Sequence, residues 1–251
     1  MKSFLPLLLL LIAAPAWPQA PAPRAQPTAE QIEARRKAED ERLRNDWAQL
    51  RRYHEANAEL LSSNPLGPPR VVFMGDSITD AWPRRSEAFF SGTGNVGRGI
   101  SGQTTPQMLV RFQQDVVALK PEVVVINAGT NDIAGNTGPS TIDMITDNLR
   151  AMTQLAEAAG IKVVLASITP AWDYPWRPGL EPVPKVAAVN QWMKGYCEGH
   201  GCVYADYHSA MSDEKGEMKE GLSTDGIHPN EAGYAIMEPI ARAAIEQASA
   251  R

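Results

Sequence analysis

The sequence has little cysteine, with two such residues among 251, and only four histidines. So few cysteines exclude a disulfide-dense scaffold. Cys197, His200 and Cys202 lie close together but fall short of the four ligands that a structural zinc site requires. In an oxidising compartment the two cysteines could instead close a small structural loop between a helix and the next strand.

Basic charge is also scarce. The 24 Lys and Arg residues are outnumbered by 29 Asp and Glu residues, which gives a formal net charge of −5. A nucleic-acid partner requires a clustered basic surface to neutralise phosphates, so the sequence argues against this class of partner. Internal repeats are absent as well. What remains is a length sufficient for one α/β domain with a substantial core.

The apolar run Leu5–Ala14 is too short to span a bilayer, and prolines follow it closely. The positive start at Lys2 and the small residues of Ala14–Ala16 match an export signal instead. We therefore expect a signal peptide over residues 1–20 that is removed from a periplasmic or secreted protein. A retained membrane anchor is the alternative, and a lipid anchor is not expected because no cysteine lies near the cleavage region.

The segment before the first strand divides into two parts. Residues 21–28 are rich in Pro and Ala and predict a flexible linker. A helix is predicted over residues 29–62, because Thr28 and Gln31 form a capping box and apolar residues recur at helical spacing. Its early half, Glu30–Arg44, is highly charged and is expected to be solvated. Its second half is expected to pack on the domain, although a role in association is also open.

Short runs rich in β-branched residues alternate with helical patterns through residues 70–248. This alternation predicts a parallel sheet that is covered on both faces. The predicted fold is α/β, a three-layer α/β/α sandwich around a five-stranded parallel sheet, with the N-terminal helix as an addition. The strands are expected at Val71–Met74, Asn95–Ile100, Val123–Ile126, Ile161–Ile168 and Val203–Tyr207, and the helices at 106–119, 140–159, 183–198 and 230–248, the last one interrupted at Pro239.

Candidate functional residues follow the first three predicted strands. Ser77, Gly102 and Asn131 would share the carboxyl edge of the sheet, where open α/β sheets bind their ligands. A serine there can be a nucleophile, but its hydroxyl is weak until a base removes its proton. Asp225 and His228, in a loop before the last helix, can supply that base. The carboxylate would hold one imidazole nitrogen and leave the other free to take the proton.

Four short blocks, in this order, resemble those of the SGNH (GDSL-type) hydrolase superfamily of esterases and lipases. The blocks are Gly75–Ser77, Gly99–Thr105, Gly129–Asp132 and Asp225–Pro229. The second block is similar to that of bacterial members near the platelet-activating-factor acetylhydrolase-like group. The resemblance covers residues 70–248, and no block departs from the family pattern.

The resemblance implies a role for each of five residues. Ser77 would be the nucleophile, His228 the general base and then acid, and Asp225 the group that orients His228. The backbone amides of Ser77 and Gly102 and the side-chain amide of Asn131 would form an oxyanion hole. Glycine lets the backbone approach a substrate closely, and an asparagine amide is a neutral donor to a developing oxyanion. No metal or organic cofactor is implied.

Two other carboxylates, Asp76 and Asp132, compete for the orienting role. Neither has a histidine nearby in the sequence. We therefore expect both to fix loops.

The implied activity is hydrolysis of carboxylic esters through an acyl-enzyme. Many bacterial members near the group named above remove small acyl groups, and export would bring the enzyme to acetylated polysaccharides. Trp172, Tyr174 and Trp176 could form a wall on which sugar rings stack, or could simply pack over the sheet. The prediction is a short-chain acyl or acetyl esterase acting on a small ester or an acylated carbohydrate. A lysophospholipase or lipase-like acylhydrolase and a non-catalytic envelope binding protein are the alternatives.

Overall fold

The structure is a computed structural model that describes residues 28–63, 67 and 69–251. The predicted export signal and nearly all of the predicted linker lie outside these residues. No helix in the described part of the chain is long and apolar enough to cross a membrane.

Five parallel strands form one sheet in the order β2-β1-β3-β4-β5. β1 and β3 are central and wholly buried, which explains their unbroken runs of valine and other apolar residues. The predicted five-stranded parallel sheet is therefore confirmed, with β1 and β3 one residue longer than expected and the other three strands shorter. They are β1 (Val71–Gly75), β2 (Asn95–Gly99), β3 (Val123–Asn127), β4 (Lys162–Ala166) and β5 (Val203–Ala205).

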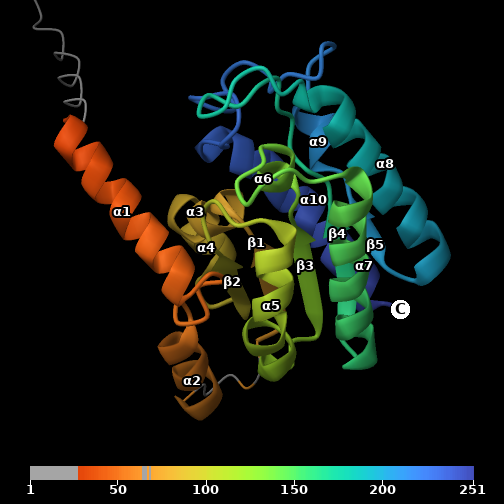
Figure 1. Ribbon diagram of the computed structural model, residues 1–251. Coiled ribbons are helices and arrows are strands. Elements are labelled where there is room, and N and C mark those ends of the chain that lie inside the picture. Colours follow the sequence, from red (N-terminus) through yellow and green to blue (C-terminus); the bar gives the residue numbers. More distant parts are fainter. Residues whose placement is uncertain (1–27, 64–66, 68) are drawn as a thin grey trace, which may run out of the picture. The chain divides into compact units, whose positions relative to one another are not determined.

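Helices cover both faces of the sheet and complete three layers (Figure 1). Side chains alternate along each strand, so Val72 and Met74 of β1 enter one core while Val71 and Phe73 enter the other. The first core is shared with α5 (Thr105–Asp115), α7 (Ile142–Ala158) and α8 (Pro182–His200), and the second with α3 (Ser77–Arg85), α4 (Glu87–Phe90), α9 (Tyr207–Met211) and α10 (Glu231–Ser249).

The single helix predicted over residues 29–62 is wrong, because the chain forms α1 (Ala29–Asn45) and α2 (His54–Ser63) with turns between them. Asp46 explains the break. Its carboxylate accepts from the backbone N–H groups of Leu50 and Arg51, at 2.8 and 3.1 Å, and so favours a turn over a continued helix. Gln49 adds to the break, since its φ of 54° is left-handed.

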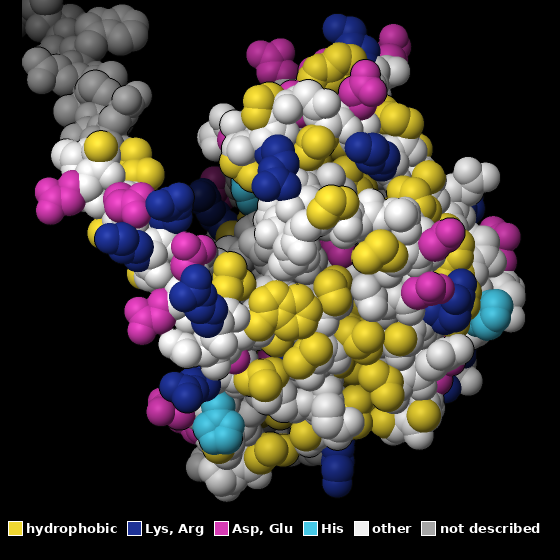
Figure 2. All heavy atoms as spheres, in the orientation of Figure 1, with side chains coloured by type: hydrophobic (Ala, Val, Ile, Leu, Met, Phe, Trp, Pro, Cys, Tyr) yellow, Lys and Arg dark blue, Asp and Glu magenta, His cyan; other side chains and the backbone are white. Residues whose placement is uncertain are grey.

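The predicted solvation of Glu30–Arg44 is confirmed, because most of its described side chains are exposed. Figure 2 shows charged side chains along α1, whereas hydrophobic ones gather over the face that carries α5 and α7.

At the other end of the chain, α10 continues through Pro239, so the predicted interruption is wrong. Proline removes only one backbone hydrogen bond there, and the helix remains packed on the sheet on both sides of it. Cys197 and Cys202 form the disulfide that the sequence suggested, between α8 and the start of β5.

Candidate active site

The register of the sheet aligns the ends of β1, β2 and β3. Gly75, the last residue of β1, pairs with Gly99 of β2 and with Asn127 of β3. The loops that follow these strands therefore leave the sheet at the same edge. A Cβ at Gly99 would lie 2.1 Å from the amide nitrogen of Asp80, so a glycine is needed where β2 passes α3.

Ser77, the first residue of α3, lies against His228 from the loop before α10. The distance from Ser77 Oγ to His228 Nε2 is 2.9 Å, and that from His228 Nδ1 to Asp225 Oδ2 is 2.7 Å. With its proton on Nδ1, the imidazole donates to Asp225, and its Nε2 accepts from the Ser77 hydroxyl. The structure thus brings together the three residues predicted as nucleophile, base and orienting carboxylate.

The carboxylate of Asp225 is held from several sides. Its Oδ1 accepts from the backbone N–H groups of Ile227 and His228, at 2.9 and 2.8 Å, and from the hydroxyl of Ser223 at 3.1 Å. Burial alone would raise the pKa of Asp225, but the hydrogen bonds from His228 and Ile227 outweigh it and lower the pKa to about 2. Asp225 is therefore ionised at neutral pH and fixed in its orientation toward the imidazole.

Unused hydrogen-bond donors lie beside this triad. In the described part of the chain, neither the backbone N–H of Ser77 nor that of Gly102 has an acceptor. Gly102 has a φ of 79°, a left-handed conformation that favours glycine. The side-chain Nδ2 of Asn131, in α6 (Thr130–Ile133), donates to the carbonyl oxygen of Gln103 at 3.1 Å. Its second amide hydrogen remains available.

Asn136, which the sequence did not single out, makes hydrogen bonds to both Asn131 and Gly102. Its Nδ2 donates to Asn131 Oδ1 at 2.9 Å and to the carbonyl oxygen of Gly102 at 3.1 Å. The first of these bonds fixes which end of the Asn131 amide carries the donor. Trp176 Nε1 in turn donates to Asn136 Oδ1 at 3.3 Å. The only signal in the sequence was the position of Asn136, five residues after Asn131.

Asp76 and Asp132 hold loops, as predicted. Asp76 caps α3 by accepting from the backbone N–H of Ile78 at 3.0 Å. Asp132 accepts from the backbone N–H of Thr105 and, at 2.6 Å, from its hydroxyl. Burial raises the pKa of each carboxyl to about 6, against the opposing effect of these hydrogen bonds.

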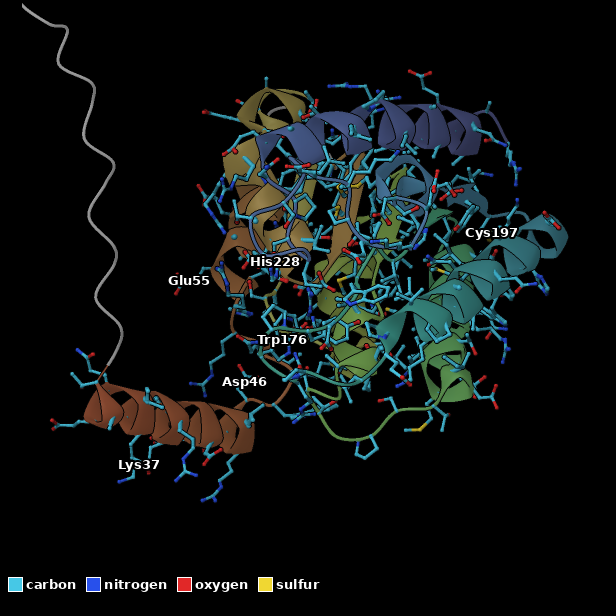
Figure 3. The ribbon with its side chains drawn as sticks, turned by 90° about the horizontal axis from the view of Figure 1, so that it is seen from above. Lys37, Asp46, Glu55, Trp176, Cys197 and His228 are labelled. Carbon is cyan, nitrogen blue, oxygen red and sulfur yellow. A yellow bond between two sulfur atoms is a disulfide. The ribbon has the colours of Figure 1, made fainter. Side chains whose placement is uncertain are left out.

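The three aromatic residues predicted to bind substrate do not share one environment. Trp172 and Trp176 are 56% and 45% exposed, and the Trp176 ring lies 6.1 Å from the ring of His228 (Figure 3). Tyr174 is fully buried, and its hydroxyl lies 3.0 Å from Thr130 Oγ1. The prediction that Tyr174 lines a sugar-stacking wall is therefore wrong, because this ring packs in the core, as the alternative of packing over the sheet has it.

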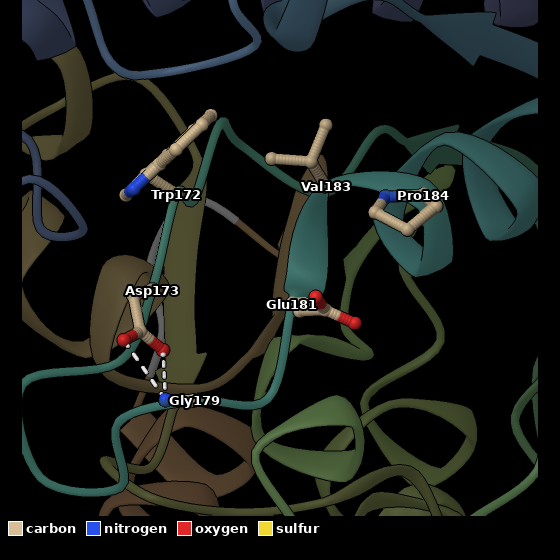
Figure 4. A pocket seen from close by; sticks show the side chains of 6 residues that line it. All are labelled: Trp172, Asp173, Gly179, Glu181, Val183 and Pro184. Carbon is tan, nitrogen blue, oxygen red and sulfur yellow. Dashed lines mark hydrogen bonds between the residues drawn. The ribbon is translucent and has the colours of Figure 1, made fainter.

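A pocket of about 420 Å³ opens on the same loop. One of its walls is the indole of Trp172, and Asp173 and Glu181 place carboxylates beside apolar side chains (Figure 4). Asp173 is engaged with the loop itself, since both of its carboxylate oxygens accept from the backbone N–H of Gly179. The lining residues are Trp172, Asp173, Gly179, Glu181, Val183 and Pro184. Among the described residues, no group of three or more His, Cys, Asp and Glu side chains could hold a metal ion.

Residues 73–236 match the GDSL-like Lipase/Acylhydrolase family. The chain belongs to this family. The match contains Ser77, Gly102, Asn131, Asp225 and His228, and it begins after α2. The resemblance to the SGNH (GDSL-type) hydrolases and the predicted fold are thus confirmed.

Relatives of this GDSL-like chain are named as lipases and esterases. A GDSL-like lipase from Bacteroides thetaiotaomicron VPI-5482 has a solved structure with 40% identity and a TM-score of 0.76, over 81% of this chain and 100% of that one. An acetylxylan esterase of Geobacillus stearothermophilus is 26% identical over 67% of this chain and 90% of that enzyme. An acetylxylan esterase of Xylanibacter ruminicola is also 26% identical, over 70% of this chain, which spans only 43% of that enzyme. At the level of the family, the prediction of a carboxylic ester hydrolase is confirmed.

Proposed function

We propose that this chain is a serine esterase that removes acetyl or other short acyl groups from carbohydrate. The observation that carries the proposal is the unbroken series of contacts from Ser77 through His228 to Asp225, at 2.9 and 2.7 Å. A hydroxyl within 2.9 Å of an imidazole nitrogen, itself oriented by a carboxylate, is the arrangement that activates a serine.

The first half of the reaction forms an acyl-enzyme. Ser77 Oγ attacks the ester carbonyl carbon while its proton passes to His228 Nε2. The carbonyl oxygen becomes an oxyanion, which accepts hydrogen bonds from the N–H groups of Ser77 and Gly102 and from the amide of Asn131. The intermediate then expels the alcohol, which takes the proton from His228, and the acyl group stays on Ser77.

The second half releases the acid. A water molecule gives a proton to His228 Nε2 and attacks the acyl carbon, and the same donors hold the new oxyanion. Breaking the bond to Ser77 Oγ frees the carboxylic acid, and His228 returns the proton to the serine. This route uses no metal ion and no organic cofactor.

The substrate class is inferred from the loop beside the triad. Trp176 lies near the ring of His228, and Trp172 presents an exposed indole to a pocket on the same loop. Flat, half-exposed aromatic rings suit the apolar faces of sugars, while Glu181 can accept from hydroxyl groups. Acetylxylan esterases among the relatives agree with a sugar-borne acetyl group. We propose as well that residues 1–20 direct export, which would bring the enzyme to such polymers.

The test is hydrolysis of p-nitrophenyl esters from acetate to palmitate, followed by acetylated xylan, with Ser77→Ala as the control variant. We expect activity to peak at acetate or butyrate and acetate to be released from the polymer. Ser77→Ala should lower kcat by about a millionfold without changing the fold.

Other outcomes would replace the proposal. A peak at long acyl chains would favour a lysophospholipase or lipase-like acylhydrolase. Turnover that persists in folded Ser77→Ala would contradict the role of Ser77. Absence of serine-dependent activity on every ester would favour an envelope binding protein. The export proposal is tested separately, by sequencing the amino terminus of the protein recovered outside the cytoplasm.

A further inference from the structure

The loop that carries Gly102 is bonded to a segment that precedes the family match. We call residues 99–104 the oxyanion loop and residues 46–57 the anchor segment. Gln103 Nε2 donates to the carbonyl oxygen of Ala48 at 2.8 Å, and the hydroxyl of Tyr53 donates to the carbonyl oxygen of Gly99. The match to the family starts at residue 73, so the anchor segment lies outside it.

Gln103 is the point at which three parts of the molecule meet. Its side chain is 1% exposed and uses both ends of its amide, since Oε1 accepts from Arg111 Nε at 2.6 Å. The backbone carbonyl oxygen of Gln103 accepts from Asn131 Nδ2 at 3.1 Å. The anchor segment is therefore connected through one residue to the amide proposed to bind the oxyanion.

Arg111 extends this support to the nucleophile. It is fully buried, pairs with Asp115 at 3.0 Å, and donates from Nη2 to the carbonyl oxygen of Gly75 at 3.0 Å. Gly75 ends the strand that leads into Ser77. The guanidinium of Arg111 thus binds both Gln103 of the oxyanion loop and the last residue of β1, and so fixes their relative positions.

The anchor segment is itself well fixed. Asp46 binds the turn that follows it, as described above, and the guanidinium groups of Arg52 and Arg98 each lie 4.8 Å from the centroid of the Tyr53 ring. Asn57 Oδ1 accepts from Arg98 Nε at 2.7 Å, and Asn57 Nδ2 donates to Asp115 at 2.7 Å. This segment can therefore act as a rigid support for the loop.

We propose that Gln103 is a positioning residue for ester hydrolysis and that the anchor segment holds it in place. One hydrogen of the Asn131 amide is bound by the Gln103 carbonyl oxygen, which aims the other hydrogen at the oxyanion. A donor misplaced by about 1 Å can cost on the order of a hundredfold in rate. The inference rests on the proposed function, and it adds residues outside the family match to the machinery of the reaction.

Gln103→Met tests the role with a side chain of similar length that cannot donate to Ala48. We expect kcat on p-nitrophenyl acetate to fall about 30-fold and KM to change less than about twofold, because the oxyanion forms only during the reaction. Gln114→Met is the matched control. Gln114 Nε2 donates to the carbonyl oxygen of Leu50, also in the anchor segment, at 2.7 Å, but it lies at the far end of α5. The kcat of Gln114→Met should stay within about twofold of that of the unmodified chain.

A double-mutant cycle separates positioning from a general loss of structure. If Gln103 acts through Asn131, then Gln103→Met should cost less than about threefold in kcat when Asn131→Ala is already present. If the fold loss in kcat of the double variant equals the product of the losses of the two single variants, the proposal is overturned.

A second substitution covers failure of the first to fold. Tyr53→Phe removes only the hydroxyl that binds Gly99, and it should lower kcat about fivefold with little change in KM. An unchanged kcat in folded Gln103→Met, or in Tyr53→Phe if the former does not fold, would overturn this inference alone. Absence of Ser77-dependent turnover in the unmodified chain would overturn the proposed function and this inference with it.

Discussion

The hydroxyl of Tyr234 donates to the carbonyl oxygen of Ile78 at 2.7 Å. This buried bond joins α10, which follows His228, to α3, which begins at Ser77. Ser77 and His228, 151 positions apart in the chain, are thereby held together by their neighbouring helices as well as by their own hydrogen bond.

Tyr234→Phe should weaken that connection. We expect the free energy of unfolding to fall by about 1 kcal/mol, since one buried hydrogen bond is lost, and kcat to fall several-fold. Urea unfolding and ester hydrolysis measure the two effects. Tyr207→Phe is the control, because the Tyr207 hydroxyl is buried without a partner among the described residues. That change should leave stability unchanged or higher, and an equal loss in both variants would contradict the account.

Asp225→Asn should lower kcat by about ten-thousandfold, because the amide no longer favours the imidazole tautomer that accepts from Ser77. The carboxyl has its pKa lowered to about 2 by folding, so its stabilising effect is complete above about pH 4 and is lost as the pH falls toward 2. The difference in unfolding free energy between the unmodified chain and Asp225→Asn should therefore narrow over that range. A constant difference from neutral pH down to about pH 2 would contradict the lowered pKa.

Asp132→Asn should change how stability depends on pH. Burial raises the pKa of Asp132 from 3.8 to about 6, so the native state keeps a proton that the unfolded chain releases between these values. The free energy of unfolding should fall as the pH rises from about 4 to about 6, by up to about 3 kcal/mol for this group. Urea unfolding at several pH values in that range gives the free energy of unfolding, which should change less steeply with pH in Asp132→Asn than in the unmodified chain. The slope should not vanish, because the pKa of Asp76 is raised in the same direction.

Removing the disulfide should affect stability and leave catalysis unchanged. Cys197 and Cys202 close a loop with a sequence separation of 5, for which the chain-entropy estimate is about 2 kcal/mol. Urea unfolding of the Cys197→Ala/Cys202→Ala double variant should show a loss of that order. A fall in kcat on p-nitrophenyl acetate would instead connect this loop to the active site.

Trp172→Ala should distinguish sugar binding from the chemistry itself. We expect KM for acetylated xylo-oligosaccharides to rise about five- to tenfold through loss of stacking, while p-nitrophenyl acetate is hydrolysed as before. Trp172→Phe, which keeps a flat ring, should recover most of the affinity. Equal losses on both substrates would place Trp172 in a structural role.

The sequence was sufficient to predict the residues that lie at strand ends. Ser77, Gly102 and Asn131 each follow a strand within a few positions, and Asp225 and His228 are close enough in the chain for local geometry to bring them together. A parallel sheet then gathers the first three at one edge. The predicted fold depended on these short-range patterns, whereas the predicted roles of the site residues depended also on the resemblance of four blocks to the SGNH hydrolases.

The supporting contacts were beyond the reach of such patterns. Gln103 binds the carbonyl oxygen of Ala48, 55 positions away, and any residue could supply that oxygen. The sequence left open whether the three aromatic rings pack over the sheet, and it did not distinguish Tyr174, whose ring is buried with its hydroxyl 3.0 Å from Thr130 Oγ1, from the two exposed tryptophans. The break before α2 depends on hydrogen bonds from the backbone N–H groups of Leu50 and Arg51 to Asp46. This turn competes closely with a continued helix.

The pairing of Gly75 with both Gly99 and Asn127 limits how this chain can vary in length. One residue added or deleted within β1, β2 or β3 would shift a loop by about 3.3 Å and turn its side chains to the opposite face. The change would disturb the packing of both cores and would also leave the donors of the shifted loop too far from Ser77. Insertions and deletions compatible with activity are therefore confined to the connections at the amino-terminal edge of the sheet and to surface loops away from the triad.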